Sequence, residues 1–192
     1  MIQLKLSNKN GNEGIVLNLP ATPAEVSEAL AWFEWIDVDF STVHIVDVSS
    51  SISNLGPYIL RANIHNPEKT NMLNELALGI EEFWQRDGEM LKFLAVLSVA
   101  QPETVSDALR FAINLDDYER ITEGAYEYGR TVLRRHGADD ELLETIDGYM
   151  DFEKLGEASM AEDGVRQTEF GLIRRCSIPF PYNTQSMQIG GI

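Results

Sequence analysis

The sequence predicts an α+β fold, because its patterns change along the chain from strand-like to helical and then to a mixture of both. Short runs of alternating or β-branched residues fill most of the first third. From Asn71 onward, apolar residues recur with the period of an α-helix, and after residue 113 helical segments lead into a strand-like one. A chain of 192 residues can form one domain or two or three small ones.

The first 35 residues predict a hairpin followed by a helix. Residues 2–6 alternate between apolar and polar types, and residues 14–19 form a second short run. The polar connection contains Asn10-Gly11, which is typical of a hairpin turn. Thr22-Pro23-Ala24-Glu25 is a capping box with proline at the first helical position, so we expect a helix to about Phe33.

A third strand and a loop are predicted next. Residues 42–48 (TVHIVDV) are rich in β-branched types and precede a serine-rich turn at residues 49–54. Residues 55–70 contain two prolines and little periodicity, so we interpret them as a loop or linker.

Residues 71–113 predict three short helices joined by tight turns. The second helix is expected to be capped by Asp87, and the third begins at Pro102 and runs to about Ile113. The residues expected on the buried face of the first helix are Leu73, Leu76, Ala77, Ile80 and Trp84.

The last third mixes helix and strand signals. Thr122 is placed to cap a helix that Gly137 ends, and a second helix is expected from Asp139 to about Tyr149. A short helical piece at residues 151–161 leads through a turn into a strand at residues 165–174. The final segment, residues 177–192, has the composition of a tail.

The charge of the chain limits its partners. There are 31 acidic and 15 basic residues, a net charge of −16, and residues 75–170 alone carry −14. Nucleic acids and anionic membranes repel such a chain, so direct binding to either is not expected. The sequence has no 18-residue apolar run, no signal-peptide pattern and a single cysteine, Cys176, which together favour a soluble cytoplasmic protein.

Few residues suggest catalysis. The three histidines, His44, His65 and His136, are far apart and match no metal-ligand spacing, so we expect no metal, no cofactor and no enzymatic activity. A hydrolase that uses a carboxylate pair, such as Asp116-Asp117, remains as the less favoured alternative. A second alternative is an acidic adaptor with some other basic partner.

One set of acidic residues is predicted to form a row on the helix that begins at Asp139. At 100° per residue its members lie within about 60° of one another and face solvent. No basic residue alternates with them, as it would in a helix optimised for stability. Such a row resembles a row of phosphates. Its members are Asp140, Glu144, Asp147 and Asp151.

Several segments together resemble a known family. They are Asn12-Glu13-Gly14 ahead of a strand and a proline-containing helix start, residues 113–118 (INLDDY) followed by Glu127-Tyr128-Gly129-Arg130, residues 147–156 (DGYMDFEKLG), and residues 168–173 (TEFGLI). In this order and spacing the chain resembles the ArdA antirestriction proteins of plasmids, conjugative elements and phages over most of residues 1–173. It lacks the family's Gly-x-Trp after the first hairpin, and its tail from Ser177 has no counterpart there.

The resemblance implies an elongated chain of three small domains. These are a small antiparallel sheet plus a helix at residues 1–69, a bundle of short helices at 70–113, and a mixed helix and strand domain at 114–176, followed by the tail at 177–192. It also implies a homodimer formed through the third domain. The residues that we expect near that contact are Tyr149, Phe152, Leu155, Phe170 and Ile173.

The same resemblance implies that the protein mimics bent DNA and occupies the DNA groove of type I restriction–modification enzymes. We therefore expect an acidic DNA mimic that inhibits such enzymes on behalf of a mobile genetic element. The acidic residues expected at the partner surface are Asp116, Asp117, Glu119, Asp140, Glu144, Asp147 and Asp151.

Overall fold

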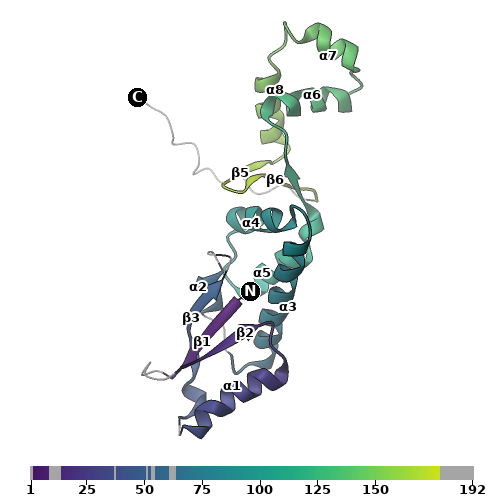
Figure 1. Cartoon of the computed structure of the whole chain (residues 1–192). Coiled ribbons are helices and arrows are strands. Elements are labelled where there is room, and N and C mark those ends of the chain that lie inside the picture. Colours follow the sequence, from purple (N-terminus) through teal and green to yellow (C-terminus); the bar gives the residue numbers. More distant parts are fainter. Residues whose placement is uncertain are drawn as a thin grey trace, which may run out of the picture. The chain divides into compact units, whose positions relative to one another are not determined.

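The computed structural model describes residues 2–8, 14–36, 38–50, 52, 55–60 and 64–177. The chain has a mixed α+β fold and divides into two compact units, Met1–Leu115 and Asp116–Ile192 (Figure 1). Residues 1–69 and 70–113 belong to one unit, so the predicted organisation in three domains is not confirmed. The predicted turn at Asn10-Gly11, part of the turn at 49–54 and the tail from residue 178 lie outside the described residues.

The N-terminal unit contains a three-stranded antiparallel sheet in the order β2-β1-β3. Its strands are β1 (Ile2–Ser7), β2 (Gly14–Leu19) and β3 (His44–Ser50). The predicted antiparallel pair of the first two strands is confirmed, with Leu4 opposite Leu17. On the third strand Leu4 lies opposite Val48, so one face of the sheet forms a continuous apolar layer.

Helix α1 (Pro23–Trp35) follows the sheet hairpin and begins where the sequence predicts. The Glu25 amide donates to Thr22 Oγ1 at 3.2 Å, and the Thr22 amide donates to Glu25 Oε2 at 2.7 Å, which confirms the capping box. The bond from the Thr22 amide, together with one from the Thr22 hydroxyl at 2.8 Å, holds the pKa of the Glu25 carboxyl below its usual value. The helix ends two residues later than predicted.

The segment 55–70 is not a loop. It contains α2 (Gly56–Ile59), and α3 (Pro67–Gln85) begins inside it. The Asn66 side chain caps α3 by accepting from the Glu68 amide at 2.9 Å, with Pro67 at the first helical position. The Asn66-Pro67 pair is therefore the helix start signal in a segment that was expected to be a loop.

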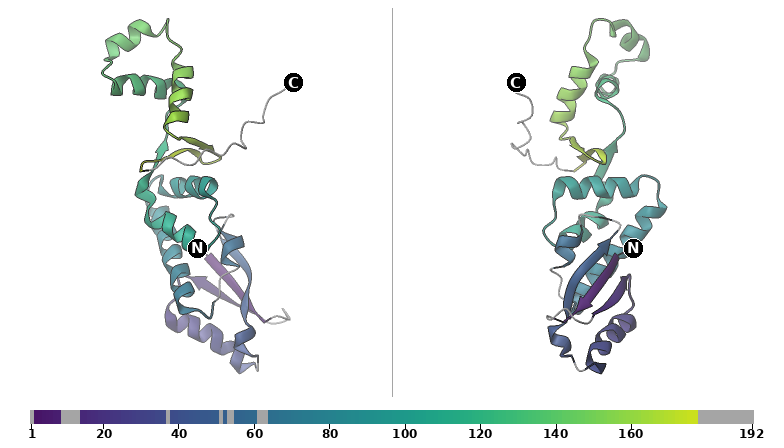
Figure 2. Two further views of the ribbon diagram at one scale, coloured as in Figure 1. Left: turned by 180° about the vertical axis from the view of Figure 1, so that it is seen from behind. Right: turned by 60° about the vertical axis from the view of Figure 1, so that its left-hand side comes forward.

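Helix α3 runs alongside the sheet, and α4 (Glu89–Ala100) and α5 (Val105–Ile113) complete the N-terminal unit (Figures 1 and 2). Trp84 is exposed, contrary to expectation, and Phe83 takes the buried position with its ring 5.2 Å from that of Phe93. Gly88, with φ 74°, precedes α4 in place of an Asp87 cap. The α5 helix begins after Thr104, not at Pro102, with a capping box to Asp107.

The C-terminal unit combines a second small sheet with three helices. The sheet has the order β4-β6-β5 and is antiparallel throughout. Figure 1 shows α7 at the end of this unit that is remote from the sheet. The elements are η2 (Leu115–Asp117), β4 (Tyr118–Ile121), α6 (Ala125–Arg135), α7 (Asp140–Ile146), α8 (Phe152–Glu162), β5 (Arg166–Thr168) and β6 (Gly171–Arg175).

Two local predictions in this unit were wrong. Helix α6 has Gly124, not Thr122, at its N-cap, and no side chain caps it. The predicted strand at residues 165–174 is a hairpin of β5 and β6. Its turn is fixed by Thr168 Oγ1, which accepts from the Phe170 amide at 3.0 Å and donates to Gly171 O at 2.7 Å.

Helices α6 and α8 cross at two glycines. A Cβ atom on Gly129 would lie 2.2 Å from Phe152 O, and one on Gly156 would lie 1.7 Å from Ala125 O. Only glycine permits this approach of two backbones. The close crossing buries Tyr128 and Phe152 completely and forms the core of the unit.

Candidate functional site

The predicted row of four carboxylates does not lie on one helix. Helix α7 ends at Ile146, three residues earlier than expected, because Asp147-Gly148 is a poor helix-forming pair and a turn signal. Asp140 and Glu144 are helical, Asp147 follows the helix, and Asp151 is the N-cap of α8. The four carboxylates would share one face only on a helix that continues to residue 149 or beyond.

Nor is the row unpaired. Arg134 on α6 contacts Asp140 Oδ1 at 2.9 Å, and Arg130 on the same helix lies 3.9 Å from Asp147 Oδ1. The Tyr126 hydroxyl also donates to Asp147. Thus two arginines of α6 supply the cations for two members of the row.

Asp151 has a local structural role. Its Oδ1 accepts from the Lys154 amide at 3.0 Å, and its other oxygen lies 3.3 Å from Lys154 Nζ. The bond from the Lys154 backbone is the main reason that the pKa of Asp151 lies below its usual value. Of the four residues, Glu144 alone forms no ion pair with another described residue.

The acidic residues ahead of α6 bind the last strand. Asp117 accepts from Arg175 Nε at 2.8 Å and from the Ser177 hydroxyl at 2.7 Å, and these contacts, the arginine first, lower the pKa of the Asp117 carboxyl. Glu119 on β4 lies 2.6 Å from Arg174 on β6. Asp116 is exposed. Asp117 and Glu119 therefore hold the sheet together.

A charged network continues from this sheet into the helices. Asp163 lies 3.7 Å from both Arg135 and Arg174, and it accepts from the Tyr128 hydroxyl. Burial of Tyr128 is the main cause of the raised pKa of its hydroxyl, and the bond to Asp163 adds to it. The network joins α6, the end of α8 and β6.

Exposed carboxylates without an ion pair are grouped on α7 and α8. Five exposed glutamates on these helices form no ion pair within the described part of the chain. The sequence places these glutamates on predicted helices. It does not distinguish them from the rest of the 31 acidic residues, because it does not show which carboxylates are ion-paired in the folded chain. They are Glu141, Glu144, Glu153, Glu157 and Glu162.

The residues expected at a dimer contact have different environments. Phe152 and Ile173 are buried within the unit itself, so neither presents surface to a second chain in this conformation. Leu155 and Phe170 are half-buried, and Tyr149 is 93% exposed. The dimer itself stays a prediction.

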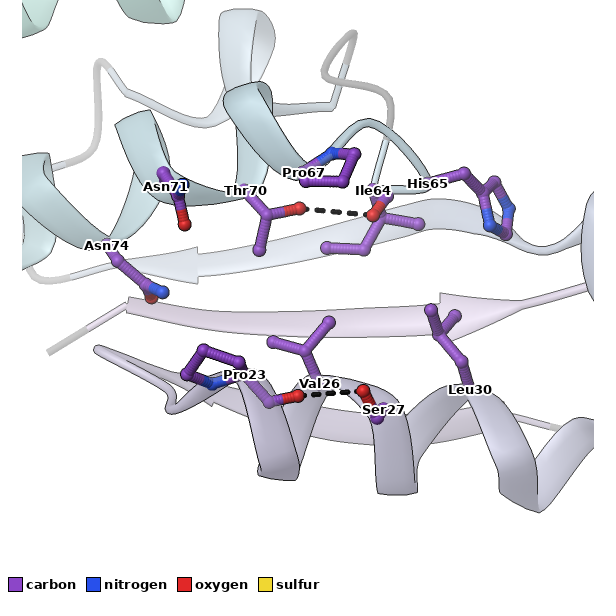
Figure 3. Close-up of a pocket in the computed structure, with 10 residues that line it drawn as sticks. All are labelled: Pro23, Val26, Ser27, Leu30, Ile64, His65, Pro67, Thr70, Asn71 and Asn74. Carbon is purple, nitrogen blue, oxygen red and sulfur yellow. Dashed lines mark hydrogen bonds between the residues drawn. The ribbon is translucent and has the colours of Figure 1, made fainter.

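A pocket of about 290 Å³ lies between α1 and the first turns of α3 (Figure 3). Several of its polar groups already have partners: the Asn74 amide binds the Ala21 backbone at 2.7 and 2.9 Å, and Thr70 donates to Ile64 O. None of its described lining residues is Asp or Glu, so they do not supply the carboxylate pair of a hydrolase. Its lining comprises Pro23, Val26, Ser27, Leu30, Ile64, His65, Pro67, Thr70, Asn71 and Asn74.

In comparisons with known proteins, no protein-family model and no curated protein matches the chain. Among the described residues, no three His, Cys, Asp or Glu side chains are grouped so as to hold a metal ion. No helix in the described ranges has the length and apolar character needed to cross a membrane.

Proposed function

We propose that the protein is an acidic DNA mimic that binds the DNA-binding groove of a defence enzyme, specifically a type I restriction–modification enzyme, and inhibits it. The observation that carries this proposal is the excess of acidic over basic residues in the C-terminal unit. Residues 116–192 contain 16 acidic and 8 basic residues, and ion pairs within the unit engage six of the basic ones. The surplus of carboxylates therefore faces solvent.

A surface of this kind suits a protein that normally binds DNA. Its groove presents Lys and Arg at the spacing of phosphates, and B-form DNA carries one charge per roughly 1.7 Å of axis. Exposed carboxylates would replace those phosphates, while the ion pairs of six of the eight basic residues reduce repulsion from the groove. The resemblance of the sequence to the ArdA proteins supports the same function.

The proposal is tested by removing four of these exposed glutamates. Replacing Glu141, Glu144, Glu153 and Glu157 with Gln removes four charges and breaks no ion pair found in the described residues. We expect inhibition of a type I restriction enzyme to weaken by at least tenfold, while the melting temperature holds. The row of Asp140, Glu144, Asp147 and Asp151 is unsuitable for this test, because three of its members are ion-paired.

A matched control lies in the N-terminal unit. Glu28, Glu34, Glu75 and Glu103 are exposed, and replacing them with Gln changes the net charge equally. The control should retain most of the inhibition. Equal losses in both variants would show that only net charge matters, and full inhibition by the first variant would refute the proposed surface.

We also propose that the protein acts as a homodimer. Twofold pairing is the commonest oligomeric state, and a dimer would extend the acidic surface. With Phe152 and Ile173 buried, the half-buried Leu155 and Phe170 are the residues placed to contribute. Sedimentation at micromolar concentration should give a dimer, and a single monomeric species would contradict this.

A further inference from the structure

The connection from α6 to α8 carries an apolar surface among its charges. We call residues 136–151 the α7 arm. It contains six carboxylates and no Lys or Arg. It also exposes three large apolar side chains, Leu142 at 48%, Tyr149 at 93% and Met150 at 40%. The arm lies at the end of the unit remote from its sheet in each view (Figures 1 and 2).

These apolar residues lie on α7 and on the turn that follows it. Leu142 and Ile146 are one helical turn apart on α7, and Tyr149 and Met150 come shortly after the helix ends. The Met150 amide donates to Ile146 O at 2.9 Å, so the turn after the helix is closed by a backbone hydrogen bond. The exposed apolar side chains of the arm are therefore concentrated in one short, ordered segment.

The turn that carries Tyr149 is fixed on both sides. The Tyr149 amide donates to Ile146 O at 2.9 Å, and the Phe152 amide donates to Met150 O at 3.2 Å. Asp147, two residues before Tyr149, is bonded to Tyr126, and Phe152 is buried in the core. A side chain presented by an ordered turn loses little conformational entropy when it binds.

Tyr149 contributes almost nothing to the stability of its own unit, because it buries so little surface there. Tyrosine is among the residue types that most often supply the affinity of protein interfaces. A large aromatic group at 93% exposure, on an ordered turn and beside a second apolar side chain, is suited to insertion into a pocket on another protein.

Charge decides which partner fits. A second copy of the chain would bring six further carboxylates against the six of this arm, and a nucleic acid or an anionic membrane would repel them likewise. We propose that Tyr149 and Met150 insert into an apolar pocket bordered by Lys and Arg on the target protein. This inference rests on the proposed function and adds to it an uncharged anchor that DNA does not possess.

An apolar anchor and a charged surface depend differently on salt. Electrostatic attraction between exposed groups is screened as salt rises, whereas apolar burial is not. The test measures binding to a purified type I restriction enzyme at low and at high salt. Tyr149→Ala should weaken binding at least tenfold, and the factor should be the same at both salt concentrations. Its melting temperature should equal that of the unchanged protein.

Two control variants define the result. Tyr149→Phe keeps the ring and should bind as the unchanged protein does. Trp35→Ala removes an aromatic side chain that is 82% exposed in the N-terminal unit, and it should leave binding unaltered. Binding by Tyr149→Ala that equals that of the unchanged protein overturns the anchor and leaves the proposed function intact.

The remaining outcomes separate this inference from the proposed function. Tight binding that depends on Tyr149 but does not compete with duplex DNA supports the anchor and refutes mimicry. No binding of the unchanged protein to the enzyme overturns both. If Tyr149→Ala converts a sedimenting dimer into a monomer, the arm contacts a second copy and the proposed partner is wrong.

Discussion

The glycine crossing of α6 and α8 gives a sharp test of the packing in the C-terminal unit. In Gly156→Ala the new Cβ would lie 1.7 Å from Ala125 O and 2.6 Å from Ala125 C. Both are backbone atoms of the facing helix, so no rotamer change relieves the overlap. To reach an ordinary contact of about 3.4 Å, the helices must separate by about 1.7 Å.

The energetic cost follows from what that separation opens. Tyr128 on α6 and Phe152 on α8 are completely buried at the crossing and would lose packing together. Overpacked cores typically lose about 1–3 kcal/mol, and an overlap with backbone belongs at the upper end of that range. The higher helix propensity of alanine offsets about 1 kcal/mol of this loss, relative to glycine. We expect a net loss of about 2 kcal/mol or more in the free energy of unfolding.

Urea denaturation followed by circular dichroism measures this loss, and hydrogen exchange of the α6 and α8 amides locates it. Gly79→Ala on α3 is the control, because its Cβ would find its nearest atoms at 4.0 Å. That variant should gain about 0.5–1 kcal/mol from helix propensity alone. A Gly156→Ala protein with an unchanged midpoint and unchanged exchange would refute the crossing as described.

Two further predictions concern hydrogen bonds that hold segments together. Asn74→Ala leaves the part-buried amide and carbonyl of Ala21 without their partners, so it should lower the free energy of unfolding by about 1–3 kcal/mol, measured in urea. Asp117→Asn removes a carboxyl whose pKa is lowered by Arg175 and then by Ser177. A lowered folded pKa stabilises the protein above the unfolded value of about 3.9, and this stability is lost as the pH falls through the folded pKa. The variant should therefore melt earlier than the unchanged protein at pH 7, and the difference should shrink below about pH 3; a constant difference would contradict the assignment.

Local sequence signals predict the parts of the fold that depend on residues close together in the chain. The capping box at Thr22 and Glu25 involves residues three apart, and the pairing of β1 with β2 follows a short connection, so both could be predicted. The sequence could not predict that Phe83 is buried and Trp84 exposed. Both residues lie close to the apolar face of α3, and the contact with Phe93 in the folded unit decides which of them is buried.

The candidate site depends on contacts between residues that are distant in the sequence, and these could not be predicted. The four-carboxylate row was inferred from spacing, but its arginine partners lie 6 and 17 residues earlier on α6, and only the folded unit brings them together. The pair Asp147-Gly148 is a turn signal in the sequence and is consistent with the end of α7 at Ile146. Exposure of Tyr149 beside a buried Phe152 is likewise a property of the tertiary structure, since both are aromatic residues of one short segment.

Mutual exclusion with DNA tests the proposed mimicry most directly. A purified type I restriction enzyme is bound to labelled duplex DNA, and the protein is titrated at several salt concentrations. The net charge of −16 predicts that DNA is displaced completely and that the affinity of the protein falls steeply as salt rises. A ternary complex of enzyme, DNA and protein, or an affinity that does not change between low and physiological salt, would contradict the account.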